Sequence, residues 1–309
     1  MRAMVTGANG FVGTSLVGQL ATDHDVIAVD ALRHGPWRLP EDLPHSVERH
    51  EVDLRDTDAT AALVEATRPD AIVHLAAIHF IPECENDPAE AIRTNLLATV
   101  NLATACPSGA RLVIASTAAV YGPSDVPHHE DRSALGPMDV YGFTKQGCED
   151  YVRYFAQQRG FDAVIVRLFN VVGPGETNPH FIPEVVAQLR GGATTLRLGN
   201  LHTQRDLIHV DDAARGFAMV ATSPWPVEGR HVTVNLGTGT EHSMSEVVDR
   251  LTALTGSAVT VEIDPGRVRP VDRPHLAADN TRIGELFGWY PKADLAEALD
   301  DVWREAGAN

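Results

Sequence analysis

Short apolar runs alternate with amphipathic stretches along the first half of the chain. The apolar runs have the length and the β-branched content of buried strands, and they lie at 1–6, 26–30, 47–52, 71–75, 111–115 and 163–167. The stretches between them predict helices at about 13–20, 57–66, 88–106 and 140–158. Strands that alternate with helices form a parallel sheet covered on both faces. We therefore predict an α/β fold with a doubly wound parallel sheet, whose ligand lies at the carboxyl ends of the strands.

The pattern changes near residue 169. Beyond it the predicted elements are shorter and less regular, with strands near 195–198, 232–235 and 259–263 and helices near 182–190 and 245–255. We predict a dinucleotide-binding domain at 1–169 and a smaller mixed α/β substrate domain at 170–309, some of whose segments return to the first domain. The run at 163–167 is expected to close the sheet as its last central strand.

The charge balance restricts the classes of partner. The 309 residues carry a formal net charge of −17, whereas nucleic acids and anionic membranes are bound through basic patches, so we expect neither as a partner. Cys84, Cys106 and Cys148 are odd in number and lack metal-ligand spacing, which predicts a reduced cytoplasmic compartment and no metal site. No apolar run is long enough to span a bilayer, and we expect no signal peptide.

A glycine-rich turn joins the first strand to the first helix. Gly7, Gly10 and Gly13 allow a tight turn, close approach of the backbone to a pyrophosphate, and close packing of a helix whose free N–H groups bind phosphate. Asp30 ends the second strand, where its carboxylate can accept both ribose hydroxyls and would repel a 2′-phosphate. This context predicts a Rossmann domain that prefers NAD, although the guanidinium of Arg33 could pair with the 2′-phosphate of NADP.

Tyr141 and Lys145 are four residues apart in a predicted helix, so their side chains share one face. A nearby ammonium favours the phenolate and lowers a pKa that is normally about 10, which would make Tyr141 an acid or base near neutrality. Taken alone, the pair is more simply explained as an amphipathic helix that carries an aromatic residue and a charge. His74, at the end of a predicted strand, is interpreted as a structural histidine and is assigned no chemistry.

The most basic stretch of this acidic chain contains Arg267, Arg269 and Arg273. Charge runs are usually solvated faces. Beside the predicted ligand site, however, arginines could also bind a diphosphate through paired hydrogen bonds. Both interpretations stand at this point.

Five motifs occur in a fixed order along the chain. They are Gly7–Gly13, His74–Ala77, Ser116–Gly122, Tyr141–Lys145 and Arg167–Pro174. In this order they resemble the extended short-chain dehydrogenase/reductase family, and within it the nucleotide-sugar epimerases, dehydratases and reductases. The resemblance continues to Gly288–Pro291 and so covers nearly the whole chain.

The resemblance implies a catalytic group of Thr117, Tyr141 and Lys145. Tyr141 would exchange the proton of a sugar hydroxyl during hydride transfer to the nicotinamide. Lys145 would lower the Tyr141 pKa and bind the nicotinamide ribose, and Thr117 would hydrogen-bond the reacting oxygen. The NAD-binding positions implied in the same way are Gly7, Asn9, Gly10, Phe11, Val12, Gly13, Asp30, Arg33, Asp53, Leu54, Leu75, Ala76, Ala77, Asn95, Tyr141 and Lys145. The implied positions for a nucleotide-diphosphate sugar are His79, Ser116, Thr117, Asn170, His180, Arg205 and Arg269.

Ala118 and Ala119 stand where 4,6-dehydratases of this family usually carry an Asp-Glu or Ser-Glu pair. A methyl group cannot move a proton, so dehydration is disfavoured. A 4-epimerase with tightly held NAD and a 4-keto-sugar reductase with dissociable NAD(P)H both remain. Asp30 and the segment 116–122 favour the epimerase. An NAD-sensing scaffold protein is disfavoured because the catalytic group is complete.

The nucleotide base and the assembly are also predicted from the resemblance. The segments 196–201 and 269–274 look more like the branch that acts on GDP-linked sugars, so a purine nucleotide is the preferred base. His180 stands where many uridine-type epimerases carry an asparagine. A homodimer through the helices at 88–106 and 140–158 is implied, although a core-facing stripe explains their apolar residues equally well.

Overall fold

A computed structural model of the protein describes residues 1–43, 47–176, 178–256, 258–268 and 273–307. Its main element is a seven-stranded parallel sheet with the strand order β10-β6-β5-β4-β1-β2-β3. The strands are β1 (Arg2–Thr6), β2 (Asp25–Asp30), β3 (Val47–Glu51), β4 (Ala71–His74), β5 (Arg111–Thr117), β6 (Asp162–Leu168) and β10 (His231–Leu236). The order is that of a dinucleotide-binding sheet with one added strand, so the predicted fold class is confirmed.

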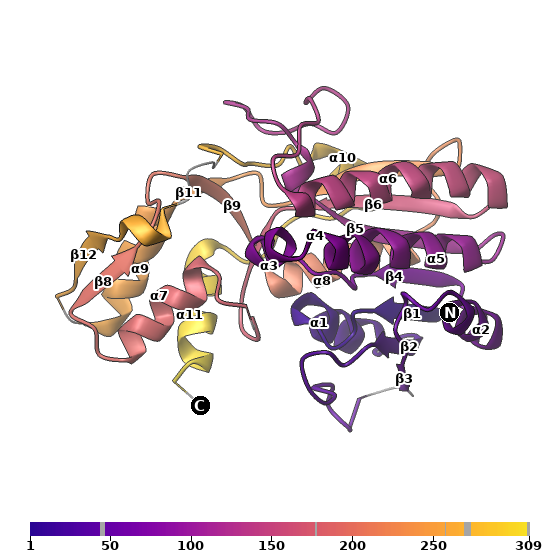
Figure 1. Cartoon of the computed structure of the whole chain (residues 1–309), viewed down its shortest axis with the longest axis horizontal. Helices are drawn as coiled ribbons and strands as arrows, with labels where there is room; N and C mark the ends of the chain where they lie inside the picture. Colours follow the sequence, from indigo (N-terminus) through magenta and orange to yellow (C-terminus); the bar gives the residue numbers. More distant parts are fainter. Residues whose placement is uncertain (44–46, 177, 257, 269–272, 308–309) are drawn as a thin grey trace.

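Helices cover both faces of this sheet (Figure 1). Successive strand residues point to opposite faces, so Val5 lies in one apolar core and Met4 in the other. Both faces are buried, which explains why the strand runs are continuously apolar. The helices on the Val5 side are α1 (Phe11–Leu20), α8 (Val210–Thr222) and α10 (Thr281–Phe287), and those on the Met4 side are α2 (Thr57–Thr67), α5 (Ala98–Ala105) and α6 (Val140–Arg159).

A smaller lobe, on the left of Figure 1, is built from the later part of the chain. It contains a three-stranded sheet, β11-β9-β7, and a two-stranded sheet, β12-β8, with its own apolar core. Its elements are β7 (Asn170–Val172), α7 (Phe181–Arg190), β8 (Thr195–Leu198), β9 (Gln204–His209), β11 (Glu241–Ser243), α9 (Met244–Thr255), β12 (Thr260–Ile263) and α11 (Leu295–Glu305).

Three elements from the region assigned to the second domain lie in the large lobe. β10 pairs with β6 along its whole length, from His231 opposite Ala163 to Leu236 opposite Leu168, and α8 and α10 cover one face of the sheet. The run at 163–167 therefore does not close the sheet, because a strand from much later in the chain pairs with its outer edge. The domain boundary near residue 169 stays a prediction.

The helix predicted at 88–106 is interrupted. α4 (Pro88–Ala91) leads into a π-helical segment, η1 (Ile92–Leu97), before α5 begins, and α3 (Ile81–Asn86) precedes them. A π-helical turn is wider than an α-helical one and is frequently found at functional sites. Asn95 lies in this turn and is buried.

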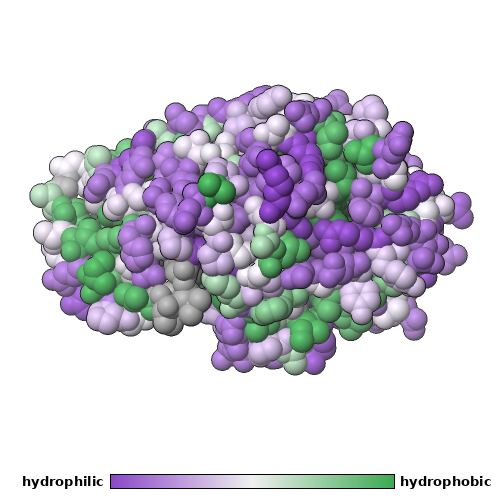
Figure 2. Space-filling view, turned by 90° about the horizontal axis from the view of Figure 1, so that it is seen from above, coloured by the Kyte–Doolittle hydropathy of each residue, from purple (hydrophilic) through white to green (hydrophobic). Residues whose placement is uncertain are grey.

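The surface seen from above is mainly hydrophilic, with hydrophobic side chains in smaller patches (Figure 2). Large apolar side chains that are exposed include Tyr151 and Tyr154 on α6 and Val261 and Ile263 on β12. Within the described ranges, every helix is too short or too polar to span a bilayer.

Candidate active site

The glycine turn packs against the end of β4. Gly7 has a φ of +69°, and a Cβ there would lie 2.7 Å from the backbone nitrogen of Ala76. A Cβ on Gly13 would lie 2.0 Å from the Gly7 carbonyl oxygen. α1 begins without a side-chain cap from Gly10, which leaves N–H groups at the helix N-terminus for an anion. The turn and Leu75–Ala77 thus form one close-packed backbone surface that fits a pyrophosphate.

Asp30 is tied to this turn, because the Asn9 backbone N–H donates to Asp30 Oδ2 over 3.0 Å. Arg33 is directed to carboxylates instead. Its guanidinium lies 3.4 Å from Glu90 and 3.9 Å from Glu83. These pairs offset the positive charge that a 2′-phosphate would require, so Arg33 gives little support for binding of NADP.

Asp53 and Leu54, two of the predicted NAD-binding positions, follow β3. Asp53 accepts hydrogen bonds from Arg55 Nε at 2.9 Å to each carboxylate oxygen, and this contact lowers the pKa of Asp53. Leu54 is buried, and its carbonyl oxygen accepts from Asn101 Nδ2 over 2.9 Å. The turn is therefore held by protein contacts, and its role in binding NAD stays a prediction.

Thr117, Tyr141 and Lys145 meet at the carboxyl end of β5. On α6, Lys145 Nζ lies 5.9 Å from the centre of the Tyr141 ring. Thr117 is the last residue of β5, and its hydroxyl lies near the Tyr141 phenol. Gly142 permits this approach, because a Cβ there would lie 2.8 Å from the Ala119 carbonyl oxygen. The structure thus brings the three predicted catalytic side chains together.

Burial controls the charge states of this group. It raises the pKa of Tyr141 above its ordinary value, although the nearby Thr117 hydroxyl acts in the opposite direction. Burial also lowers the pKa of Lys145, whose Nζ donates to the Ala115 carbonyl oxygen over 2.8 Å. The expected lowering of the Tyr141 pKa by Lys145 is therefore not found in the protein alone. Removing water from the phenol outweighs the nearby ammonium.

Ser116, one residue before Thr117, belongs to a buried ionic network. Its hydroxyl donates to Glu149 Oε1 over 2.5 Å. Arg167 binds both oxygens of the same carboxylate, with Nε 2.9 Å from Oε1 and Nη2 2.7 Å from Oε2. Burial acts to raise the pKa of Glu149, but the hydrogen bonds from Arg167 outweigh it and the pKa lies below its ordinary value. The Ser116 hydroxyl is directed to this network, and its contact with a sugar stays a prediction.

His74 and Asn95 stabilise the neighbouring strand ends. His74 Nδ1 lies 2.7 Å from Thr6 Oγ1 and Nε2 lies 3.0 Å from Thr99 Oγ1, while burial lowers the pKa of His74 to about 3. These contacts confirm its structural interpretation. Asn95 accepts from the Ile78 N–H over 2.8 Å and donates to the Ile78 carbonyl oxygen over 3.0 Å. Asn95 thereby fixes the start of the loop after β4.

The predicted substrate residues form two groups. His79 and His180 are neighbours, with ring centres 5.6 Å apart. Asn170 on β7 and Arg205 on β9 lie on adjacent strands, in a register that puts both side chains on one face of the small sheet. Arg269 lies outside the described residues.

The two described arginines of the basic stretch have different partners. Arg267 pairs with Glu184 over 2.9 Å. Arg273 is buried and donates to the carbonyl oxygens of Ala119 and Tyr121 over 2.9 and 3.1 Å. These contacts favour structural roles for both side chains rather than one shared clamp for a diphosphate.

Sequence reasoning missed three acidic residues near the site. Asp139 caps the N-terminus of α6, and an acidic residue directly before a predicted helix was the available signal. Glu149 lies on α6 but is identified only by its partners on β5 and β6. Glu176 stands beside His79 and His180, and no local pattern connects these segments.

The chain is similar to known proteins. Residues 3–237 match the family described as "NAD dependent epimerase/dehydratase family". The chain is 34% identical over 314 residues to the UDP-glucose 4-epimerase of Mycolicibacterium smegmatis, which covers 97% of this chain and 96% of that relative. It is 28% identical over 311 residues to the GDP-6-deoxy-D-mannose reductase of Pseudomonas aeruginosa, which covers 96% and 94%.

A solved structure shows the same fold. A UDP-glucose-4-epimerase from Stenotrophomonas maltophila, with bound NAD and formylated UDP-arabinopyranose, has a TM-score of 0.89 at 26% identity and covers 100% of this chain and 98% of that one. The family match extends over most of the sequence, from the first strand to the end of β10. The chain therefore belongs to the NAD-dependent epimerase/dehydratase family, within the extended short-chain dehydrogenases/reductases.

Proposed function

We propose that this protein is a nucleotide-diphosphate-sugar 4-epimerase that uses NAD. The observation that carries the proposal is the group at the end of β5, where the Thr117 hydroxyl lies near the Tyr141 phenol and Lys145 lies one helical turn away. An alcohol gives up a hydride only when a base takes its proton, and Tyr141 would be that base. Bound NAD would supply the hydride acceptor and a positive charge that favours the phenolate.

Each side chain has one role in this scheme. Thr117 holds the oxygen on C4 of the sugar, Tyr141 takes its proton, and Lys145 binds the nicotinamide ribose. After the 4-keto sugar rotates in the site, the hydride would return to the opposite face of C4 and Tyr141 returns the proton to the oxygen on that carbon. Ala118 and Ala119, buried next to Thr117, offer no second acid or base, which supports reversible oxidation over dehydration.

The second candidate is an NAD(P)H-dependent 4-keto-sugar nucleotide reductase. The similarity to the P. aeruginosa reductase favours it, because a reductase needs the same three catalytic side chains. Asp30 and the pairing of Arg33 with Glu90 favour the epimerase, since both disfavour a 2′-phosphate.

The cofactor that leaves the denatured protein distinguishes the two. We expect freshly purified protein to release NAD in nearly equimolar amount on denaturation, and to invert C4 of a sugar nucleotide without added cofactor. An empty site together with an absolute requirement for added NADPH would contradict the epimerase and support the reductase.

The nucleotide base is proposed to be a purine, on the resemblance of the segment 196–201 to the GDP-sugar branch. An NMR screen for C4 inversion of GDP-, ADP-, CDP-, UDP- and dTDP-sugars tests it. Turnover of UDP-sugars alone would contradict the purine and assign a pyrimidine base, and the proposed 4-epimerase reaction would still hold.

We also propose a cytoplasmic homodimer formed through α6 and η1. On α6, Phe143, Tyr151 and Tyr154 are 62%, 48% and 58% exposed, and Ile92 and Leu97 of η1 are exposed as well. Apolar surface on neighbouring helices fits a helical interface. Light scattering should give twice the chain mass of 33.3 kDa. The cysteines, all free and buried, fit a reducing compartment.

A further inference from the structure

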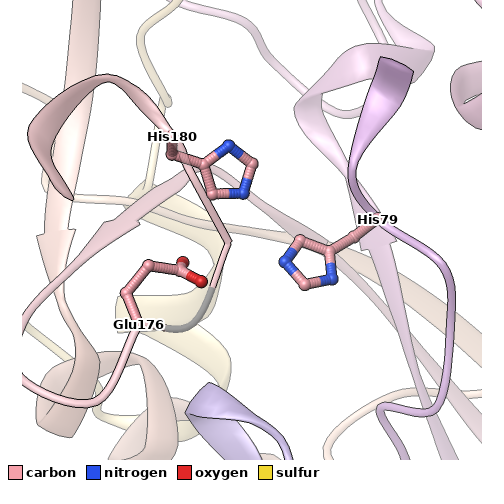
Figure 3. A group of neighbouring side chains, drawn as sticks. All are labelled: His79, Glu176 and His180. Atoms are coloured by element: carbon pink, nitrogen blue, oxygen red, sulfur yellow. The ribbon is translucent and has the colours of Figure 1, made fainter. Parts of the chain in front are cut away.

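Three side chains with metal-ligand chemistry meet beside the proposed sugar site. His79 lies in the loop after β4, and Glu176 and His180 lie between β7 and α7. Figure 3 shows the three side chains directed toward one another. One potential ligand atom from each lies within 4.8 Å of the other two. The two imidazole rings are tilted by 36°, so they converge without stacking face to face.

We propose that His79, Glu176 and His180 bind a divalent transition-metal ion, for which Zn²⁺ is the best match. Two histidines and one glutamate supply the nitrogen and oxygen ligands that Zn²⁺ takes, and they leave a fourth position for water or a substrate oxygen. Ligand atoms of a tetrahedral zinc site are roughly 3.4 Å apart, so the side chains must approach by up to about 1.4 Å. All three residues lie outside helices and strands and are at least partly exposed, so side-chain rotation can supply this approach.

Neighbouring contacts already orient the group. Asn178 Nδ2 lies 3.1 Å from His79 Nε2, so the His79 ring is attached to the segment that carries the other two ligands. Phe80 packs edge to face against His180, with ring centres 5.5 Å apart. Contacts that fix the orientation of ligand side chains are a regular feature of metal sites.

Charge distinguishes a cation from the alternative occupant, the diphosphate of a sugar nucleotide. The Glu176 carboxylate lies within 4.8 Å of both imidazoles and repels an anion there. The same carboxylate, in a chain of net charge −17, attracts a cation. The proposal is independent of whether the enzyme is an epimerase or a reductase.

A bound ion would join the loop after β4 of the large sheet to the segment after β7 of the small one. An ion that binds the folded state and not the unfolded one stabilises the fold by mass action. We therefore expect ZnCl₂ to raise the melting temperature of the metal-free protein.

The test is calorimetric titration of the metal-free, full-length protein with ZnCl₂. We expect one ion per chain and at least tenfold weaker binding in His79→Gln, Glu176→Gln and His180→Gln. The matched control is His242→Gln. His242 and Glu246 form a His–Glu pair 3.1 Å apart, but within the described residues they do not belong to a group of three potential metal ligands. Equal affinity in all four variants, or loss in His242→Gln alone, would overturn the proposal.

A second measurement uses the unaltered protein, so it does not depend on the folding of a variant. In protein labelled with ¹⁵N at histidine, ZnCl₂ should shift the ring signals of two histidines together, at one equivalent of metal. Assignment of those signals through the variants identifies the residues. Shifts at histidines other than His79 and His180 would assign the ion to another place and overturn the proposal.

Discussion

Two groups of polar side chains are built on the same strand and the same helix, yet their chemistry differs. Thr117 on β5 and Lys145 on α6 belong to the proposed catalytic group. Their neighbours on these elements, Ser116 and Glu149, belong to the ionic network of Arg167. The two groups are therefore adjacent, because Lys145 and Glu149 lie one helical turn apart on α6.

The difference lies in how the charges are compensated. The Glu149 carboxylate is paired with Arg167 and its pKa lies below the ordinary value, so it stays ionised and inert. Burial shifts the pKa values of Tyr141 and Lys145 away from their charged forms. A buried group without full compensation is ready to exchange a proton with a ligand, whereas a compensated one holds the fold together.

Removing the Tyr141 phenol from the catalytic group should have the largest effect on turnover. Tyr141→Phe is expected to lower turnover by about 10²- to 10⁴-fold, because the proton carrier is lost, and to leave NAD binding and stability nearly unchanged. Steady-state kinetics, cofactor titration and thermal melting measure the three quantities. Tyr290→Phe, at an exposed position outside the proposed dimer interface, is the matched control. Unchanged turnover in Tyr141→Phe would refute the role of the phenol.

Breaking the ionic network of Arg167 should lower the stability of the protein and leave its turnover nearly unchanged. Glu149→Gln leaves the Arg167 guanidinium buried without its counter-charge, and we expect the free energy of unfolding to fall by about 3–5 kcal/mol. Turnover per folded molecule should stay within a few-fold of the unaltered enzyme. Urea denaturation gives the stability, and Glu65→Gln on the exposed side of α2 is the control. If turnover per folded molecule fell by more than a few-fold, Glu149 would instead be assigned to the catalytic group.

Acid pH tests a third kind of buried group, the neutral His74. The unfolded chain protonates this residue near pH 6.5, whereas the folded protein does so only at about pH 3. Between these values the unfolded state binds the extra proton, so stability falls as the pH falls, by up to about 1.4 kcal/mol per pH unit from this residue. His74→Gln should flatten that dependence in urea titrations from pH 7 to pH 4. An unchanged slope would show that other groups cause it.

The smallest expected effect compares two adjacent hydroxyls. Ser116→Ala should cost about 1 kcal/mol of stability, because one hydrogen bond to a buried carboxylate is lost, and should leave turnover within about twofold. Thr117→Ala should instead lower turnover more than tenfold with less effect on stability. Urea denaturation measures the stability of both variants, and steady-state kinetics measures their turnover. Lower turnover in Ser116→Ala would restore its predicted contact with the sugar.

Local patterns in the sequence predicted much of this picture. The apolar runs predicted the strands of the large sheet up to β6, and the glycine turn with Asp30 predicted the cofactor end of that sheet. The spacing of Tyr141 and Lys145 predicted their shared helix face, because helical geometry fixes where residues four apart lie. Each of these features depends on residues close together in the chain.

Features that depend on distant segments were not predicted. The partner of Glu149 is on β6, and the approach of His79 to Glu176 and His180 requires the packing of two lobes. The sign of the Tyr141 pKa shift was also missed, because helix spacing reports the nearby ammonium but not the loss of water. Burial is a property of the whole fold.

The late strand β10 has a consequence for how the chain can be divided. β10 pairs with β6, and α8 packs on the same core through Phe217 and Val220, so residues 1–169 contain only part of their own sheet and cover. A polypeptide ending at 169 would leave the backbone edge of β6 unpaired and one sheet face exposed, both of which promote aggregation. During synthesis the ribosome must pass residue 236 before that sheet is complete. The cofactor-binding half is therefore a spatial unit and not a stretch of chain that can be cut free.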